Sequence, residues 1–446
     1  MDGSHRQTGT FAGTGVRDIT PPSGSDLAGS IVRVVSTGIA ARLMARSIVL
    51  ESAGRKLVFC AVDVAVIPNE TARSVRTRVQ ERLGIPAEAV MIGATHTHNG
   101  PVVTPLNDES VPAGSGYIPF MEDQLVASIV EADETRVPAR IGVAVGEEPS
   151  LVFNRRLKRP DGRIVMNFIG KASLSDCRSD GPVDPDVFLI RAEDLSGKTV
   201  GLVVNFPLHN NAGGGRQLHS DISGFLEEVM QSGLGAECPV LFLAGASGDV
   251  NWLDYRNAKQ TSGLEEARRI ADVLGERLVR MSEAITMRDD LPLACVHTEV
   301  SIAERPLQPI DHTDDGCFGG SGTAFDGFYA GIRDRLQGHT EWDTHTYDIS
   351  AFRIGDTVWI SNPGELFVRL GLDVKSKSPF GAKGTCMCTL TNGYAGYIPT
   401  PEAFREGGYE VRRTLYSSFL DTEAGPLFVD KSLELCGLLF DREDRG

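Results

Sequence analysis

The chain has 446 residues, of which 41% are apolar and 23% are charged, a balance typical of a globular protein with a large core. Its formal net charge of −16 argues against nucleic acid and anionic membrane surfaces as partners. No apolar stretch is long enough to cross a bilayer, and the start, Met1–Arg6, lacks the basic and apolar regions of a signal peptide. Together with eight scattered cysteines, these features predict a cytoplasmic protein with reduced thiols and no membrane insertion.

The first quarter of the chain has the pattern of a β-α-β unit. Residues 1–14 are rich in Gly and Thr, and we expect a flexible N-terminus there. Two strands are expected at 46–50 and 56–63, followed by a helix at 69–83 whose apolar residues recur at helical spacing. A further apolar run at 88–92 predicts a buried strand, parallel to the one before the helix.

The remainder of the chain continues to alternate expected strands and helices. Residues 303–345 are rich in Gly, Asp and Thr and are expected to form loops around a short helix. Without an internal repeat or a linker, residues 15–446 are predicted to form a single large α/β domain of layered mixed β-sheets with flanking helices. The expected strands are 140–145, 188–192, 199–206, 238–244, 351–354 and 357–360, and the expected helices are 120–134, 222–233 and 264–285.

The stretch Gly93–Pro101 contains His96 and His98, two of the nine histidines in the chain. In a strand, side chains at i and i+2 point to the same face, so we expect both imidazoles to leave the strand end in the same direction. This placement suits a metal ligand beside a catalytic partner. A hydrogen-bonded pair of histidines without a metal fits the spacing equally well.

His209 and Glu365 also follow apolar strands, each close to a turn or loop that contains Gly or Pro. Ligands of α/β folds gather where strand ends open into loops. Two imidazoles and one carboxylate form a ligand set of catalytic zinc with an open position for water. Each residue alone fits a structural role, but the shared strand-end position predicts a zinc site.

Three other motifs in the sequence give weaker evidence of a functional site. Ser247 is a possible nucleophile, but its surroundings do not match the G-x-S-x-G elbow, so a small loop residue is the better interpretation. The glycines at 213–215 are not followed by the G-K-[ST] of a phosphate loop. Cys386 and Cys388 lack a second cysteine pair and are interpreted as structural.

Taken in order, several motifs between residues 94 and 410 form a specific set. They are Ala94–Pro101, Asn154-Arg155, His209, Ser220-Asp221, Gly248–Val250, Asn362–Glu365, Thr391–Tyr397 and Tyr409-Glu410, with Asp18–Pro22 before them. This set resembles the N-terminal catalytic domain of the neutral (non-lysosomal) ceramidases.

The resemblance implies a zinc ion held by two histidines, a glutamate and a tyrosine, which fall on His96, His209, Glu365 and Tyr397. Without the family, Tyr397 would be interpreted as an ordinary packed aromatic residue. The resemblance also implies that His98, Arg155 and Tyr409 line the reaction centre.

The family hydrolyses the amide bond between a fatty acyl group and a sphingoid base. Zinc lowers the pKa of a bound water to about 7 and polarises the scissile carbonyl. Tyr409 and Arg155 are candidates to stabilise the developing oxyanion, and His98 is a candidate to pass a proton to the departing amine. The assignment of acid and base among these three residues stays open.

The chain departs from the family pattern in the signal peptide and the C-terminal immunoglobulin-like domain, neither of which is recognised here. Ala244–Ala246 also replaces residues that are usually polar in the family. We therefore expect a zinc-dependent hydrolase of a linear, non-peptide amide, acting on a small soluble molecule rather than on ceramide. A zinc-dependent lactone or ester hydrolase and a non-catalytic binding protein with a relic site are the alternatives. The sequence leaves the oligomeric state and any second metal open.

Overall fold

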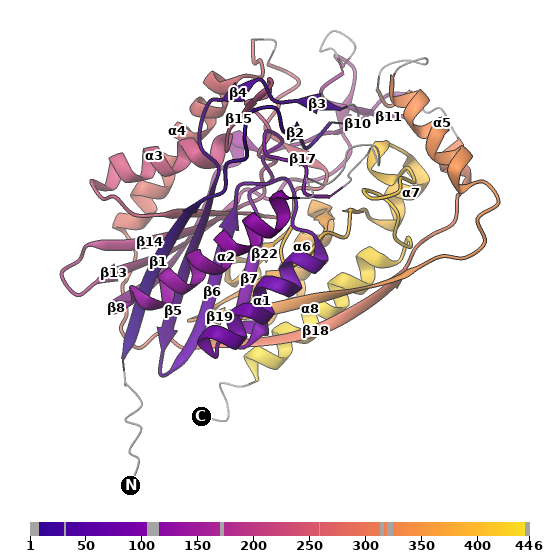
Figure 1. Cartoon of the computed structure of the whole chain (residues 1–446). Helices are drawn as coiled ribbons and strands as arrows, with labels where there is room; N and C mark the ends of the chain where they lie inside the picture. The colour runs from indigo at the N-terminus through magenta and orange to yellow at the C-terminus, as the bar shows by residue number, and fades with distance from the viewer. Residues whose placement is uncertain are drawn as a thin grey trace.

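The computed structural model describes residues 9–30, 33–104, 116–169, 174–257, 259–312, 316–318 and 324–441. Its largest element is an eight-stranded mixed sheet (Figure 1). In spatial order the strands are β16 (Val240–Ala244), β14 (Thr199–Phe206), β13 (Asp186–Asp194), β8 (Val137–Glu147), β1 (Thr10–Asp18), β5 (Met44–Ser52), β6 (Arg55–Val62) and β7 (Val90–Ala94).

The predicted β-α-β unit is present in this sheet. β5 and β6 form an antiparallel hairpin whose turn residues, Ala53 and Gly54, both have positive φ. Helix α1 (Asn69–Leu83) follows and ends at Gly84 in the left-handed conformation, a common helix stop. β7 then pairs with β6 in parallel, which places the segment after β7 at the carboxyl end of the sheet.

A second, four-stranded sheet packs against the first. It contains β18 (Leu293–Ala303), β19 (Thr344–Ile354), β20 (Thr357–Ser361) and β22 (Thr385–Cys388). β18 contacts β6 and β22 contacts β14. The rings of Phe352 and Trp359 meet Phe59 of β6 with centroids 5.3 and 5.7 Å apart, so aromatic packing joins the sheets.

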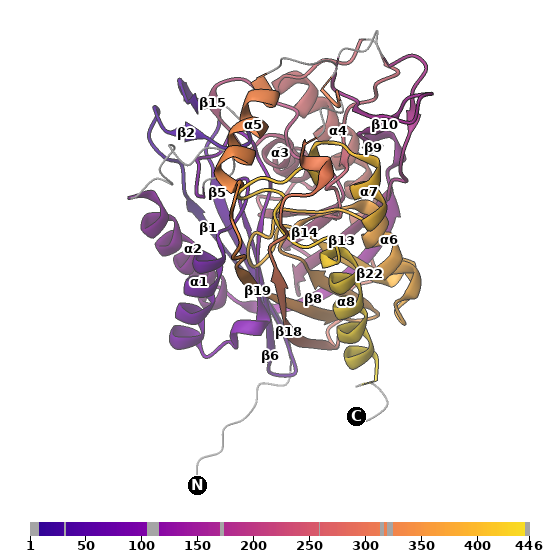
Figure 2. The same cartoon turned by 90° about the vertical axis from the view of Figure 1, so that its right-hand side faces the viewer.

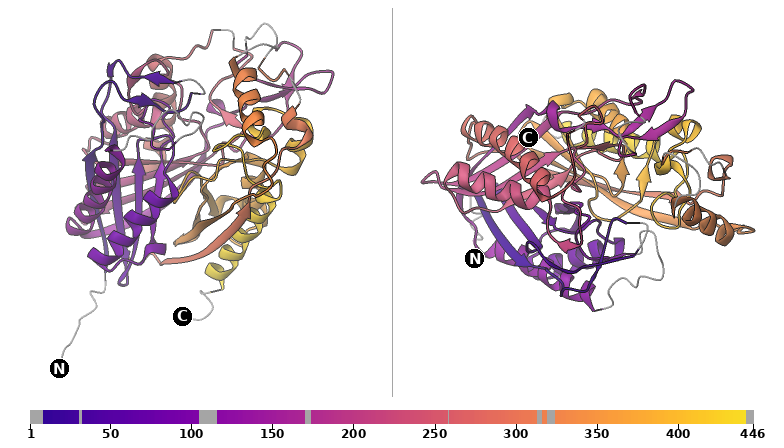
Figure 3. Two further views of the ribbon diagram at one scale, coloured as in Figure 1. Left: turned by 45° about the vertical axis from the view of Figure 1, so that its right-hand side comes forward. Right: turned by 90° about the horizontal axis from the view of Figure 1, so that it is seen from above.

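Helices cover the outer faces of the two sheets (Figures 2 and 3). α1 packs on α2 (Tyr117–Glu134), and α2 packs on β1 and β5. α8 (Ala424–Phe440) packs on β18 and β19, with α6 (Val368–Lys377) beside it. The other helices are α3 (Ile222–Leu234), α4 (Leu264–Glu283), α5 (Ala324–Leu336) and α7 (Pro401–Glu406).

Short strands complete the fold and several of them hold candidate site residues. The pairs are β2 (Asp26–Leu27) with β3 (Val34–Val35), β4 (Gly38–Ile39) with β15 (Gln217–Leu218), β9 (Phe153–Asn154) with β17 (Val250–Asn251), and β21 (Glu365–Leu366) with β23 (Tyr397–Ile398). A three-stranded sheet contains β11 (Ile164–Met166), β10 (Arg156–Lys158) and β12 (Arg178–Ser179).

The layered α/β architecture is confirmed, with two differences from the expected elements. Residues 10–14 belong to β1, where they pair with β5, so the ordered chain begins before residue 15, and residues 1–8 lie outside the described part. Strands β18 and β22 and helices α6 and α8 are not among the elements expected from the sequence. Among the described helices, none is both long and apolar enough to span a bilayer.

Candidate active site

His96 and His98 converge through a turn and not through strand alternation. β7 ends at Ala94, and His96 adopts a positive φ of 65° while its backbone N–H donates to the Val64 carbonyl. Such a conformation is uncommon for a residue other than glycine and marks a site that its surroundings hold in place. The prediction that the two rings lie together is correct, but its reason, a shared strand face, was wrong.

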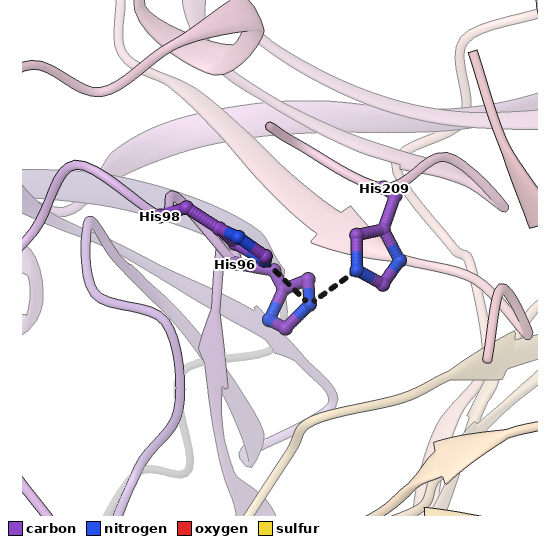
Figure 4. Close-up of side chains that lie close together, drawn as sticks. All are labelled: His96, His98 and His209. Atoms are coloured by element: carbon purple, nitrogen blue, oxygen red, sulfur yellow. Dashed lines mark hydrogen bonds between the residues drawn. The ribbon is translucent and has the colours of Figure 1, made fainter. Parts of the chain in front are cut away.

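Three imidazoles meet at this turn (Figure 4). The Nε2 atom of His96 lies 3.0 Å from Nε2 of His209 and 3.4 Å from Nε2 of His98. Nδ1 of His96 is 2.7 Å from the Ala65 carbonyl, to which it donates. This bond leaves the lone pair of His96 on Nε2, pointing at the other two rings.

Glu365 and Tyr397 come from the second half of the chain and face each other across β21 and β23, where they are direct register partners. Gly364 and Gly248 permit this arrangement. A Cβ at Gly364 would lie 2.4 Å from Ile398, and one at Gly248 would lie 2.2 Å from the Glu365 carbonyl oxygen. The Gly248-Asp249 motif therefore provides a close backbone approach to the strand of Glu365.

The donor set fits a divalent cation. Oε2 of Glu365 is buried without a hydrogen-bond partner among the described residues. It lies 3.6 Å from Nε2 of His96 and 3.9 Å from Nε2 of His209. Two ligand atoms that each lie about 2.0 Å from a tetrahedral zinc ion are about 3.3 Å from one another, close to the distances found here. A buried carboxylate oxygen without a hydrogen bond also costs free energy unless a cation neutralises its charge.

The protonation states of these donors suit the same cation. Burial works to raise the pKa of Glu365, but the polar groups that face its carboxylate and the charge of Arg155 hold the pKa below its usual value, so the side chain is an anion. Burial lowers the pKa of His209, and it lowers that of His98 to about 3, so both rings are neutral. Burial raises the pKa of Tyr397, which keeps it a phenol unless a cation stabilises the phenolate.

Arg155 is 2% exposed and reaches the same centre. Nη1 lies 3.4 Å from Nε2 of His209, and Nη2 donates to the Gly248 carbonyl at 2.6 Å. Its guanidinium carbon lies 5.0 Å from the ring centre of Tyr409, whose hydroxyl is 3.3 Å from that of Tyr397. Burial opposes the charge of Arg155, but the surrounding phenols and carboxylates raise its pKa, and the group is a permanent cation.

All of the predicted site residues line one cavity of about 380 Å³. The structure thus brings together side chains that are far apart in the sequence. They are His96, His98, Arg155, His209, Glu365, Tyr397 and Tyr409.

Two further residues, which are not among the candidates predicted from the sequence, hold the side chains of this centre in place. The hydroxyl of Tyr394 donates to Oε1 of Glu365 at 3.0 Å. Glu410 is fully buried and accepts from Nε of Arg155 at 3.0 Å and from Nη1 of Arg156 at 3.2 Å. Both lie inside the motifs noted above, but their partners are distant in sequence, so spacing gave no signal for these roles.

The rival motifs have structural roles. The Ser247 backbone carbonyl lies 3.4 Å from Nδ1 of His209, and Gly213 N–H donates to the Asp221 carboxylate. Cys386 and Cys388 are buried in β22, with sulfur atoms 3.9 Å apart.

Comparison with known proteins shows the fold and a similarity to the neutral ceramidases. Residues 11–214 match the family model described as neutral/alkaline non-lysosomal ceramidase, N-terminal. The neutral ceramidase of Pseudomonas aeruginosa is 24% identical to the chain, over 90% of this chain and 68% of that protein. The chain is similar to the neutral ceramidases in sequence and in fold. Neutral ceramidase A of Dictyostelium discoideum is 28% identical over 44% of this chain and 28% of its own length.

Solved ceramidases share the fold along nearly the whole chain. A ceramidase complexed with C2 superposes with a TM-score of 0.74 and 19% identity, covering 98% of this chain and 76% of that one. The crystal structure of neutral ceramidase from P. aeruginosa gives a TM-score of 0.73 and 20% identity, covering 97% and 75%. This similarity supports a hydrolase that acts on an amide bond.

Proposed function

We propose that this protein is a zinc-dependent hydrolase that cleaves a linear, non-peptide amide bond in a small molecule. The observation that carries the proposal is the convergence of imidazole nitrogens on the unpartnered Oε2 of Glu365. In this assignment His96, His209, Glu365 and Tyr397 hold the zinc ion. Bound zinc supplies a Lewis acid that polarises a carbonyl and lowers the pKa of a water molecule.

The remaining residues bind and orient the amide. Arg155 is a buried cation and Tyr409 stays a phenol, since burial raises its pKa. Both therefore donate hydrogen bonds to the carbonyl oxygen as negative charge develops on it, which lowers the barrier. His98 is neutral, and its Nε2 faces the cavity beside His96. As a neutral base, its ring is placed to accept the proton that the attacking water releases and to pass a proton to the departing nitrogen.

A compact substrate is favoured over ceramide by the size of the cavity. Its volume of about 380 Å³ lies near the lower end of the roughly 300–1,000 Å³ range of small-molecule sites. We also propose a cytoplasmic location.

Metal content and turnover test this function together. We expect purified protein to contain zinc, to lose amidase activity after chelation, and to regain it when zinc is restored. His96→Ala is expected to lose both metal and activity, whereas His312→Ala, which changes an exposed histidine outside the cavity, keeps both. Full activity in metal-free protein would contradict the proposal.

Matched amide and ester substrates test the bond that is cleaved. We expect turnover of amides, with Arg155 and Tyr409 supporting the polar transition state of that reaction. Turnover of esters or lactones alone would assign the other bond class, and no turnover with a native phenotype in His96→Ala would assign a binding protein.

A further inference from the structure

A polar part of the cavity wall has no part in the chemistry described above. Asn211 lies two residues after His209, Trp252 directly follows β17, and both side chains line the cavity. The indole Nε1–H of Trp252 donates to Oδ1 of Asn211 at 2.9 Å. Trp252 is 7% exposed and belongs to the apolar cluster of the eight-stranded sheet, so its ring is a fixed support for the Asn211 amide.

This hydrogen bond sets the direction of the Asn211 amide. An indole N–H can only donate, so the amide atom that faces it is the carbonyl oxygen, and the NH₂ group points away from Trp252. Nδ2 of Asn211 has no hydrogen-bond partner among the described residues and, unlike Oε2 of Glu365, it is not buried. The cavity therefore presents the N–H donors of this amide to a ligand.

The loop that carries Asn211 is held on both sides of this residue. The backbone N–H of Asn211 donates to the His209 carbonyl at 3.0 Å. The next two N–H groups, those of Ala212 and Gly213, donate to Oδ1 of Asp221 at 3.1 and 3.0 Å, and Asp221 is only 2% exposed. A donor that is fixed in this way loses little freedom when a ligand binds, so more of its hydrogen-bond energy appears as affinity.

We propose that Asn211 determines specificity by donating to a substrate oxygen other than the scissile carbonyl, so that the substrate is an amide with a hydroxyl or carboxylate oxygen. This rests on the proposed function, in which Arg155 and Tyr409 serve the scissile carbonyl. The Cα atom of Asn211 is at most about 7 Å from that of His209, a proposed zinc ligand, which favours an oxygen a few bonds from the scissile amide. An amide without such an oxygen leaves the Asn211 donors unpaired when it displaces water, which costs affinity.

Pairs of amides with equal numbers of non-hydrogen atoms test the proposal. With a hydroxyl, the pairs are N-(2-hydroxyethyl)acetamide with N-propylacetamide, and N-propyl-3-hydroxypropanamide with N-propylbutanamide. With a carboxylate, they are N-acetylglycine with N-isobutylacetamide, and N-propylsuccinamate with N-propyl-4-methylpentanamide. We expect kcat/KM of the oxygen-bearing amide to be at least about threefold higher in at least one pair, as one hydrogen bond allows. That pair identifies the kind of oxygen and its side of the amide bond. No such preference in any pair would overturn the proposal.

Variants connect the preference to Asn211. Asn211→Leu keeps the approximate size of the side chain without its donors, and we expect it to bring the kcat/KM ratio within the preferred pair to about one. Trp252→Phe removes the bond that orients the amide and should lower the ratio in part. Asn257→Leu is the matched control and should keep the ratio, because Asn257 is exposed, lines no part of this cavity, and its Oδ1 also accepts from an N–H, that of Lys259. The ratio does not depend on the amount of active protein, so an equal loss for both members in Asn211→Leu would overturn the proposal.

Binding without turnover separates a failure of this proposal from a failure of the proposed function. If no amide of any pair is hydrolysed, the proposed function fails. Calorimetry with the same pairs of amides then tests Asn211 by itself. Tighter binding of the oxygen-bearing member of a pair, lost in Asn211→Leu and kept in Asn257→Leu, supports the role of Asn211, and equal binding within every pair overturns it.

Discussion

At the scale of single residues, the site depends on buried side chains that orient the proposed metal ligands. Glu365 is 5% exposed, and its two oxygens differ. Oε1 accepts from the Tyr394 hydroxyl, while Oε2 faces His96 and His209 without a partner among the described residues. One oxygen is thus fixed by the protein and the other is left for a cation, which is the arrangement expected of an oriented carboxylate ligand.

Removal of the Tyr394 hydroxyl should weaken metal binding without unfolding the protein. We predict that Tyr394→Phe lowers zinc affinity about 10- to 100-fold, measured by competition with a chelator, because Glu365 loses the bond that orients it. Tyr347→Phe is the control, since the Tyr347 hydroxyl is also buried but has no partner among the described residues. Equal zinc affinity in the two variants would contradict the role of Tyr394.

Glu410 is predicted to stabilise the fold around Arg155. Its carboxylate pairs with Arg155 and Arg156, and all three side chains are at most 3% exposed. Glu410→Gln leaves two buried cations with less compensation, so we expect a loss of about 3 kcal/mol in the free energy of unfolding, measured with urea. Glu402→Gln changes an exposed pair with Arg405 and should cost less than about 0.5 kcal/mol. Similar losses in both variants would contradict the prediction.

At the scale of elements, the strand ends and the short paired strands position the site. The sequence predicted β5, β6, α1 and β14 well because each has a local pattern, either a continuous apolar run or helical spacing. β18 was missed because its exposed face is polar and its apolar face packs on α8, another element that was not predicted. Tertiary packing, and not local propensity, defines that pair.

The candidate metal ligands were also predictable from the sequence only where they follow a strand with a clear local pattern. His96, His209 and Glu365 follow apolar strands, and this position alone indicated them. Tyr397 had no such signal, because its place beside Glu365 comes from β21 and β23, strands of two residues each that are too short to show a period. Only the family resemblance pointed to Tyr397, and the register explains how it reaches the site.

The start of α6 gives a prediction at this scale. The N-cap residue of α6 is Phe367, whose side chain makes no capping hydrogen bond. The carboxylate of Asp249 caps the helix instead, because its Oδ1 accepts from the Val368 N–H at 2.7 Å. Asp249→Ala should destabilise the protein by about 2 kcal/mol and lower amidase activity, because α6 begins three residues after Glu365. Glu148→Ala removes the cap of a short helix outside the cavity and should lower stability alone. Unchanged activity in Asp249→Ala would contradict the link.

At the scale of the whole molecule, the proposed metal ligands come from segments that follow strands of both sheets, and the two sheets are otherwise joined by side-chain packing. His96 follows β7 and His209 follows β14, both in the eight-stranded sheet, whereas Glu365 and Tyr397 belong to segments that follow the four-stranded sheet's β20 and β22. One side of the four-stranded sheet, including Phe352 and Trp359, packs in the apolar cluster of the eight-stranded sheet, and its other side packs in a second cluster with α6 and α8. A cation at the centre would connect the two halves.

Zinc should therefore stabilise the entire fold and not only a loop. A ligand that binds only the folded state at 100 times its dissociation constant adds about 2.7 kcal/mol to the free energy of unfolding, and we expect the melting temperature to rise by a few degrees. His96→Ala should abolish the rise, because it removes a ligand from the first half of the chain. His297→Ala, an exposed histidine of β18 outside the cavity, should preserve it. Calorimetric melting of metal-free protein with and without added zinc measures both. A melting temperature independent of zinc, or a rise that survives in His96→Ala, would show that no metal joins the two halves.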